Sequence, residues 1–144
     1  MATSKAATNY LERRLLHFLF KNNSLSFSSP GDSIYVVLAT AVSAAETGSV
    51  TEANFTNYAR QQVTAANWTT IGADSTDTQT AKKSDNIEFP ASGGGGTDTI
   101  THVFIADASS SGNILFVGAL DASKAIAEGD IFRINANNLT IELK

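Results

Sequence analysis

From residue 31 to residue 144 the sequence is a succession of short apolar runs, each broken by Gly, Asn, Asp or Ser. Runs of this length between turn-forming residues are typical of β-strands, and seven or eight of them have that form. No cluster of catalytic residue types runs through them. We therefore expect a rigid β-sandwich whose task is to present a surface.

Four of these runs are the clearest strands. Residues 34–40 are apolar on both faces, which predicts a central strand. Residues 58–63 alternate like a strand. Residues 100–107 and 113–120 are the two longest candidates, and the small polar residues between them predict a β-hairpin.

The rest of the chain carries weaker signals. Residues 44–53 are small and polar, which predicts an exposed loop, and Asn137-Asn138 predicts a second hairpin turn. The last strand alternates, with Leu139, Ile141 and Leu143 expected to face inward.

A helix is expected before the strands. Asn9 has the form of an N-cap, and Glu12 follows three residues later as in a capping box. Apolar residues then recur at helical spacing, and Asn22-Asn23 should end the helix. The stripe consists of Leu11, Leu15, Phe18 and Leu19, widened by Tyr10, Leu16 and Phe20. Such an apolar helix must cover something: either it caps one end of its own sandwich, or it packs against another chain.

These patterns give a fold class and a division of the chain. Residues 1–22 are expected to be a loose polar arm followed by the helix. Residues 23–144 are expected to form a single domain, an all-β, jelly-roll-like β-sandwich. A length of 144 residues suits one domain with a core that needs no cross-links.

Composition excludes several partners and sites. The chain has no Cys, so it can form neither disulfides nor thiolate metal sites. A net charge of −4 without a basic stripe argues against nucleic-acid binding. No apolar run approaches the roughly eighteen residues of a membrane span, and no signal peptide is evident, so we expect synthesis in a cytoplasm and no membrane partner.

Chemistry-bearing residues are sparse. His17 and His102 lie far apart in the sequence, and we expect His102 to be a strand residue bonded to a neighbouring backbone group. Asp74, Asp77 and Asp85 lack the spacing of a calcium loop. We therefore predict no catalytic residues, no metal, no cofactor and no enzyme activity.

Arg60 is the one charged residue with two open interpretations. It lies within the predicted strand of residues 58–63, and an Arg there either belongs to an exposed strand face or anchors a subunit interface.

The order of residues resembles a family of short tailed-bacteriophage virion proteins, often labelled tail fibre proteins, and is similar to small β-proteins that decorate capsids. The resemblance covers most of the chain from Asn9 onward. One departure is Phe104, where a Gly is expected after the Thr-His pair. The segments that carry it are Asn9 to Glu12, residues 34–40, Glu52, Tyr58-Ala59-Arg60, Trp68, Phe89-Pro90, Thr101-His102, Asp107-Ala108, residues 112–115, Gly118, Gly129-Asp130 and residues 139–141.

The resemblance implies a virion structural protein, made in the cytoplasm of a bacterial host. Tail fibres usually gain length from coiled-coil heptads or β-helical repeats, and this chain has neither. We therefore expect a capsid decoration, or cement, protein on the outer capsid surface, which binds the major capsid protein and itself as a homotrimer. The expected subunit or capsid contacts are Tyr10, Leu11, Leu15, Phe18, Leu19 and Arg60.

The alternative is a tail fibre or tail-tip module that binds a receptor or carbohydrate. Trp68, Tyr58 and Tyr35 are the aromatic residues available for a sugar, although they are not clustered in sequence.

Overall fold

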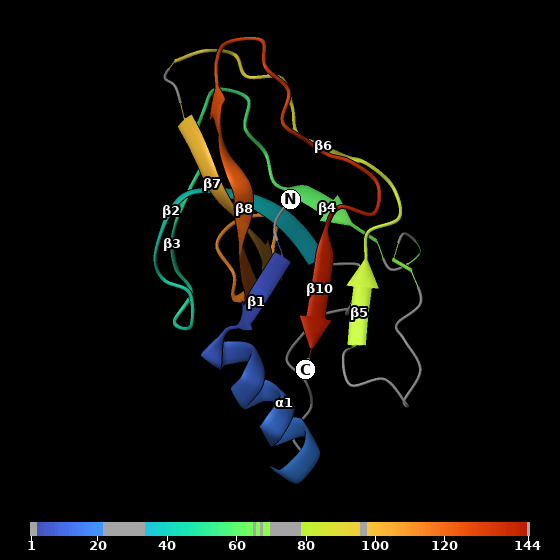
Figure 1. Cartoon of the computed structure of the whole chain (residues 1–144). Coiled ribbons are helices and arrows are strands. Elements are labelled where there is room, and N and C mark those ends of the chain that lie inside the picture. Colours follow the sequence, from blue (N-terminus) through green and yellow to red (C-terminus); the bar gives the residue numbers. More distant parts are fainter. Residues whose placement is uncertain are drawn as a thin grey trace.

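The computed structural model describes residues 3–21, 34–64, 66, 68–69, 79–95 and 98–143. Within these residues the chain is mostly β, with one helix near the N-terminus (Figure 1). The elements are β1 (Thr3–Ala7), α1 (Asn9–Lys21), β2 (Ile34–Ala44), β3 (Ser49–Glu52), β4 (Gln61–Val63), β5 (Gln79–Lys82), β6 (Ile87–Glu88), β7 (Asp98–Ala106), β8 (Ile114–Ile126), β9 (Arg133–Ile134) and β10 (Thr140–Leu143).

One large sheet organises the described residues. Its strands follow the order β3-β2-β7-β8-β1-β10-β5, and β4 pairs with β2. Strands β6 and β9 form a separate two-stranded sheet. Of the described strand pairs, only β1 with β10 is parallel, and the others are antiparallel.

Core residues alternate between the two faces of the large sheet. Val36 and Leu38 of β2 belong to the larger apolar cluster, whereas Val37 and Ala39 belong to a smaller one on the opposite face. The larger cluster also includes Leu11 of α1 and four residues on or beside the small sheet: Ile87, Phe89, Phe132 and Ile134. The small sheet therefore packs on the large one. The predicted all-β fold with an N-terminal helix is confirmed, and this packing is consistent with a β-sandwich.

Strand β2 is central, as predicted, but its ladder on the side away from β7 is interrupted. Val36 pairs with Gln61 of β4, and Ala39 pairs with Glu52 of β3. Leu38 lies in the gap, where its N–H donates to the Tyr58 hydroxyl at 3.1 Å. The Tyr58 side chain thus replaces a strand partner. The predicted strand over residues 58–63 is shorter than expected, since only Gln61–Val63 forms β4.

The hairpin predicted from residues 100–120 is confirmed as β7 and β8. Its turn is held by Asp107, whose carboxylate accepts the Asn113 N–H at 2.7 Å and the Asn113 side-chain amide at 2.8 Å. Gly112 has a φ of +78°, a conformation that glycine adopts without strain.

The N-terminal arm is a strand and not the loose segment expected from its polar sequence. Strand β1 lies between β8 and β10, with Thr3 opposite both Ala119 and Thr140. The division into residues 1–22 and 23–144 stays a prediction, but β1 is part of the large sheet.

The N-cap of α1 lies one residue earlier than predicted. Thr8, not Asn9, is the cap: its hydroxyl accepts the Leu11 N–H at 3.4 Å and donates to the Ile114 carbonyl at 2.5 Å. The helix ends at Lys21, just before the predicted stop at Asn22.

Two loop predictions were wrong. Residues 44–53 contain β3, because they pair back onto the long β2. Asn137 adopts a φ of 64°, as its sequence suggested, but the turn joins β9 to β10, which belong to different sheets and do not form a hairpin. Leu139 is buried and Ile141 packs on the core, as expected, whereas the side chain of Leu143 lies outside the described residues.

Candidate functional site

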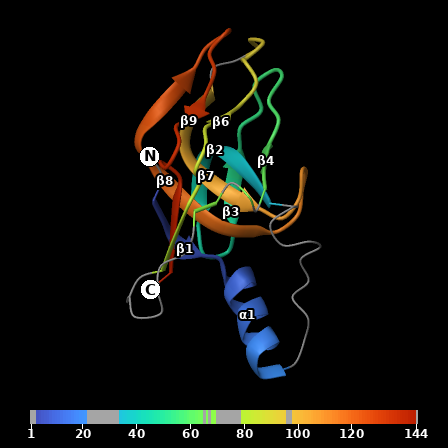
Figure 2. The same ribbon diagram turned by 90° about the vertical axis from the view of Figure 1, so that its right-hand side faces the viewer.

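The second half of α1 is the most exposed apolar surface in the part of the chain that the structure describes. The exposed fractions are 56% for Leu16, 49% for Phe18, 65% for Leu19 and 77% for Phe20. We call these four side chains the helix surface. Both views show α1 projecting from one end of the sheet (Figures 1 and 2). Leu16, Leu19 and Phe20 are neighbours at helical spacing, and large apolar side chains exposed together form a candidate interaction site.

The first half of α1 is attached to the body of the protein. Leu11 is buried in the larger cluster, and Tyr10 and Leu15 pack against it. The expectation that the helix caps its own sandwich therefore describes its first half. Tyr10, Leu11 and Leu15 cap their own core, while Phe18 and Leu19 remain exposed; that any of them contacts another subunit stays a prediction.

The polar side of α1 is basic. It carries Arg13, Arg14 and Lys21 against the single acid Glu12. The Arg14 guanidinium lies over the Tyr10 ring, 5.2 Å from its centroid. No helix within the described residues has the length and hydropathy to cross a membrane.

Arg60 joins three parts of its own chain. Its Nε and Nη2 donate to the two carboxylate oxygens of Glu52 at 2.9 and 2.7 Å. Its Nη1 donates to the carbonyls of Ala108 and Ser111, each at 2.8 Å. The guanidinium also lies 5.8 Å from the centroid of the Phe104 ring. The hydrogen bonds to Glu52 raise the pKa of Arg60, so its guanidinium stays charged.

This geometry does not fit the interpretation of Arg60 as a residue of an exposed strand face. The residue precedes β4, and its side chain is only 8% exposed. It fastens the β7–β8 turn to β3, and its role as a subunit contact stays a prediction without support from an exposed face. Phe104, the departure noted above, is buried and provides the ring beneath it.

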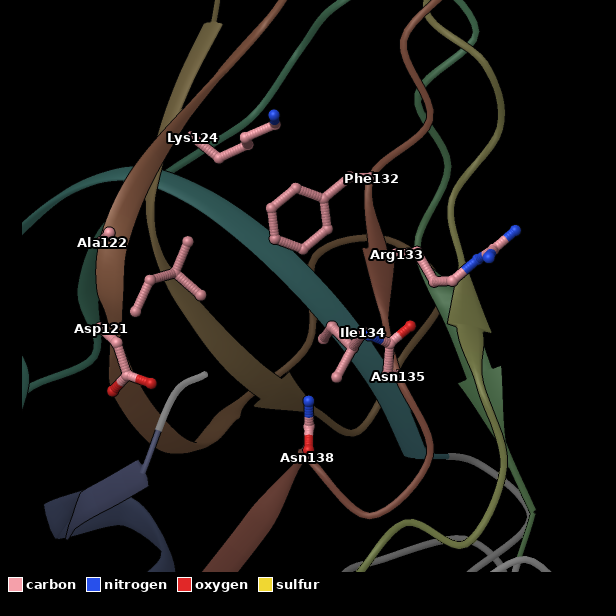
Figure 3. A pocket seen from close by; sticks show the side chains of 9 residues that line it. Asp121, Ala122, Lys124, Phe132, Arg133, Ile134, Asn135 and Asn138 are labelled. Atoms are coloured by element: carbon pink, nitrogen blue, oxygen red, sulfur yellow. The ribbon is translucent and has the colours of Figure 1, made fainter.

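An open groove of about 220 Å³ lies where β8 changes register (Figure 3). His102 of β7 pairs with Ala119 of β8, and Ile100 pairs with Lys124. Two residues that are two positions apart on β7 therefore face residues that are five positions apart on β8. The extra residues form a bulge that turns Leu120, Asp121 and Ala122 into the groove wall.

Residues from the β9 region form the other wall of this groove. Its lining includes Phe132, Ile134, Asn135 and Asn138, in addition to Lys124 of β8. Figure 3 shows the Phe132 ring between the two walls. Arg133 also lines the groove, but it forms an ion pair with Glu88 on β6. The groove therefore combines an apolar floor with a carboxylate, an ammonium group and two carboxamides.

Metal chemistry finds no support in the described residues, where no group of three or more His, Asp or Glu side chains could hold an ion. His102 Nδ1 lies 2.8 Å from the Thr101 hydroxyl, a side-chain partner in place of the expected backbone one. Asp85 pairs with the buried Lys83, whose burial lowers its pKa. Asp74 and Asp77 lie outside the described residues.

The aromatic residues proposed for a sugar do not meet on the surface. Tyr58 stacks on Phe89, with ring centroids 6.1 Å apart. Trp68 packs against the larger cluster and Tyr35 against the smaller one. The groove at Phe132 was missed because its residues come from a bulge and from the region of β9, and only the asparagines at 135, 137 and 138 hinted at it.

Comparison with known protein families places the chain among the fibre proteins of tailed phages. The sequence model of the family described as "Podophage GP4 fiber I protein gp80" matches residues 6–142, and the chain belongs to this family. No curated protein matches it. It is a component of the phage virion, and the prediction that it is not an enzyme is confirmed by its membership of a structural family.

The same finding corrects the function predicted from the sequence. The family is one of fibre proteins, so the prediction of a capsid cement protein on the outer capsid surface, bound to the major capsid protein, was wrong. The error came from expecting each fibre chain to carry its own long repeats. A fibre can also be assembled from several compact chains, which need only the right contact surfaces.

Proposed function

We propose that this protein is a structural module of the phage fibre, which joins neighbouring copies of itself through the helix surface, with a homotrimer as the expected assembly. The observation that carries the proposal is the exposure of Leu16, Phe18, Leu19 and Phe20 on an ordered helix. Membership of the fibre family supports it.

The energetics favour a covered helix surface. Burying a large apolar side chain stabilises by about 1.5–3 kcal/mol, so covering four that are each about half exposed or more contributes roughly 1 kcal/mol apiece. The side chains stand on a helix whose first half is held by Leu11, so association needs to order side chains but not the helix backbone.

The test is the assembly state of the purified protein by sedimentation velocity. The helix variant Leu16→Ser/Leu19→Ser/Phe20→Ser should be folded, because these side chains lie outside the core, and should sediment as a monomer. The wild type should form the larger species. Identical masses for the two proteins at every concentration would contradict the proposal.

Leu11→Ala is the matched control on the same helix. Leu11 is 7% exposed and belongs to the core, so its truncation should lower the free energy of unfolding by about 2–5 kcal/mol. The folded fraction of this variant should still assemble. Stability and assembly are thus separated on one helix.

The groove at Phe132 supports a second candidate function, the binding of a saccharide. Polar side chains around an apolar floor suit the hydroxyl groups and the apolar ring face of a sugar, and the volume of about 220 Å³ suits a single residue of a glycan. Asp121 and the two amides, Asn135 and Asn138, offer acceptors and donors, and Lys124 offers a charged donor.

A glycan screen followed by titration of the best ligand tests this second candidate. Lys124→Ala and Asn138→Ala should each weaken binding by about tenfold, the usual effect of losing one strong hydrogen bond. Lys82→Ala, on the exposed side of β5, should leave the affinity unchanged. The candidate fails if no saccharide binds, or if all three variants bind equally well.

A further inference from the structure

Strongly exposed large apolar side chains occur in two places among the described residues. One is the helix surface of α1. The other is Ile131, which is 52% exposed in the loop between β8 and β9. A lone exposed apolar residue is ordinary, but this one lies on a loop of fixed shape.

Backbone hydrogen bonds fix that loop. The Asp130 N–H donates to the Ala127 carbonyl at 3.0 Å, and the Asp130 carboxylate accepts the Ala127 N–H, also at 3.0 Å. Ser92 donates to the Asp130 carbonyl at 2.9 Å and accepts the Gly129 N–H at 2.8 Å. Ile131 is therefore presented on a preorganised surface.

Opposite charges accompany the two apolar surfaces. The helix surface is flanked by Arg13, Arg14 and Lys21. Ile131 follows Glu128 and Asp130, both exposed. We call Glu128, Asp130 and Ile131 the loop surface. The two surfaces match in kind and are complementary in sign.

The two surfaces lie at opposite ends of the protein. The start of β8 is fastened to the N-terminus of α1, where the Ile114 carbonyl accepts the Thr8 hydroxyl. Strand β8 then runs to Ile126, and the loop surface follows it. Figures 1 and 2 both show α1 at one end and the far end of β8 at the other. One copy therefore cannot satisfy both of its own surfaces.

Charge also argues against pairing α1 with α1. Three of the ten Lys and Arg residues but only one of the fourteen Asp and Glu residues lie in this helix. Packing two such helices side by side would bring basic flanks together with only Glu12 of each helix to offset them. The remainder of the chain is acidic, and the loop surface offers an apolar contact with that acidity.

We propose that the helix surface of one copy docks on the loop surface of the next, in a head-to-tail contact. This inference rests on the proposed function and names the partner face. A head-to-tail contact closes into a ring when the rotation between copies permits, as in a cyclic trimer, and otherwise continues as an open filament. In both arrangements, each copy that has a neighbour on either side has its helix surface and its loop surface covered.

Mixing two blocked variants tests the contact. The first is the helix variant defined above, and the second is the loop variant Ile131→Lys/Glu128→Lys. Each should be monomeric alone by sedimentation velocity. Their mixture should form a complex of one copy of each and grow no further, because one working helix surface meets one working loop surface.

A contact between helices gives a different result. The loop variant alone would then assemble like the wild type while the helix variant stays monomeric, which overturns the head-to-tail contact and leaves the proposed function intact. Assembly that survives in the helix variant would instead contradict the proposed function itself.

Disulfide trapping provides an independent readout, because the chain contains no Cys. Leu19→Cys and Ile131→Cys are made in separate chains, mixed and mildly oxidised. A disulfide between the two different variants is expected, with little product from either alone. Equal trapping of Leu19→Cys with itself, or no mixed product, would refute the proposal.

Discussion

Replacing Arg60 by Ala should be strongly destabilising, because its side chain is only 8% exposed and fastens the β7–β8 turn to β3. The guanidinium makes two hydrogen bonds to Glu52 and one each to the Ala108 and Ser111 carbonyls. Removing one partner of a buried charged pair costs about 3–5 kcal/mol. Because the Glu52 side chain is 32% exposed and can regain water, we expect a loss at the lower end, about 3 kcal/mol.

Chemical denaturation of the monomeric helix variant, with and without Arg60→Ala, measures this loss without a contribution from assembly. In thermal melts of the same two proteins, a loss of that size should lower the melting temperature by roughly 10 °C for a chain of this length. Arg60→Lys keeps the charge but cannot form the forked contact with Glu52, so it should fall between the wild type and Arg60→Ala.

Arg133→Ala is the matched control. Its ion pair with Glu88 has side chains that are 49% and 48% exposed, and exposed pairs contribute about 0–1 kcal/mol. If Arg60→Ala destabilises the protein no more than Arg133→Ala does, the account of Arg60 as the fastening of the turn is wrong.

Three further outcomes are expected. Tyr58→Phe should lower the free energy of unfolding by about 1–3 kcal/mol, since it leaves the Leu38 N–H without its acceptor. Chemical denaturation measures this loss. Burial raises the pKa of the Tyr58 hydroxyl above its ordinary 10.0. The stabilisation from the protonated hydroxyl is therefore present below pH 10 and is lost as the pH rises above 10. Above pH 10, the free energy of unfolding should fall more steeply with pH for the wild type than for Tyr58→Phe. Gly112→Ala should cost more than Gly129→Ala in thermal melts: both have positive φ, worth roughly 1–3 kcal/mol of strain, but only at Gly112 would a Cβ lie 2.6 Å from the Ala108 Cβ. Equal melting temperatures for the two glycine variants would show that the close contact relaxes freely.

The sequence predicted those elements whose signal is local. The β7–β8 hairpin has long apolar strands joined by small polar residues, and α1 has helical spacing and a nearby stop. By contrast, β1 was missed because residues 3–7 carry no alternation of their own. They become a strand only because β8 and β10 supply partners, and such partners are invisible in a local pattern.

The candidate sites divide in the same way. The exposed half of α1 was within reach of the sequence, because its apolar residues extend further around the helix than one sheet can cover. The partners of Arg60 were not, since Glu52, Ala108 and Ser111 converge only through the turns of the fold. The groove likewise depends on a register shift in β8, which no spacing of residue types announces.

The position of β1 has a consequence for biogenesis. Strand β1 leaves the ribosome before its two neighbours, residues 116–119 and 140–141, have been made. At synthesis rates of about 5–20 residues per second, it waits roughly 7–27 seconds before both are present. Closure of the sheet around β1 is therefore a late event, and a nascent chain stalled before residue 116, which lacks both partners, should expose residues 3–7 to protease.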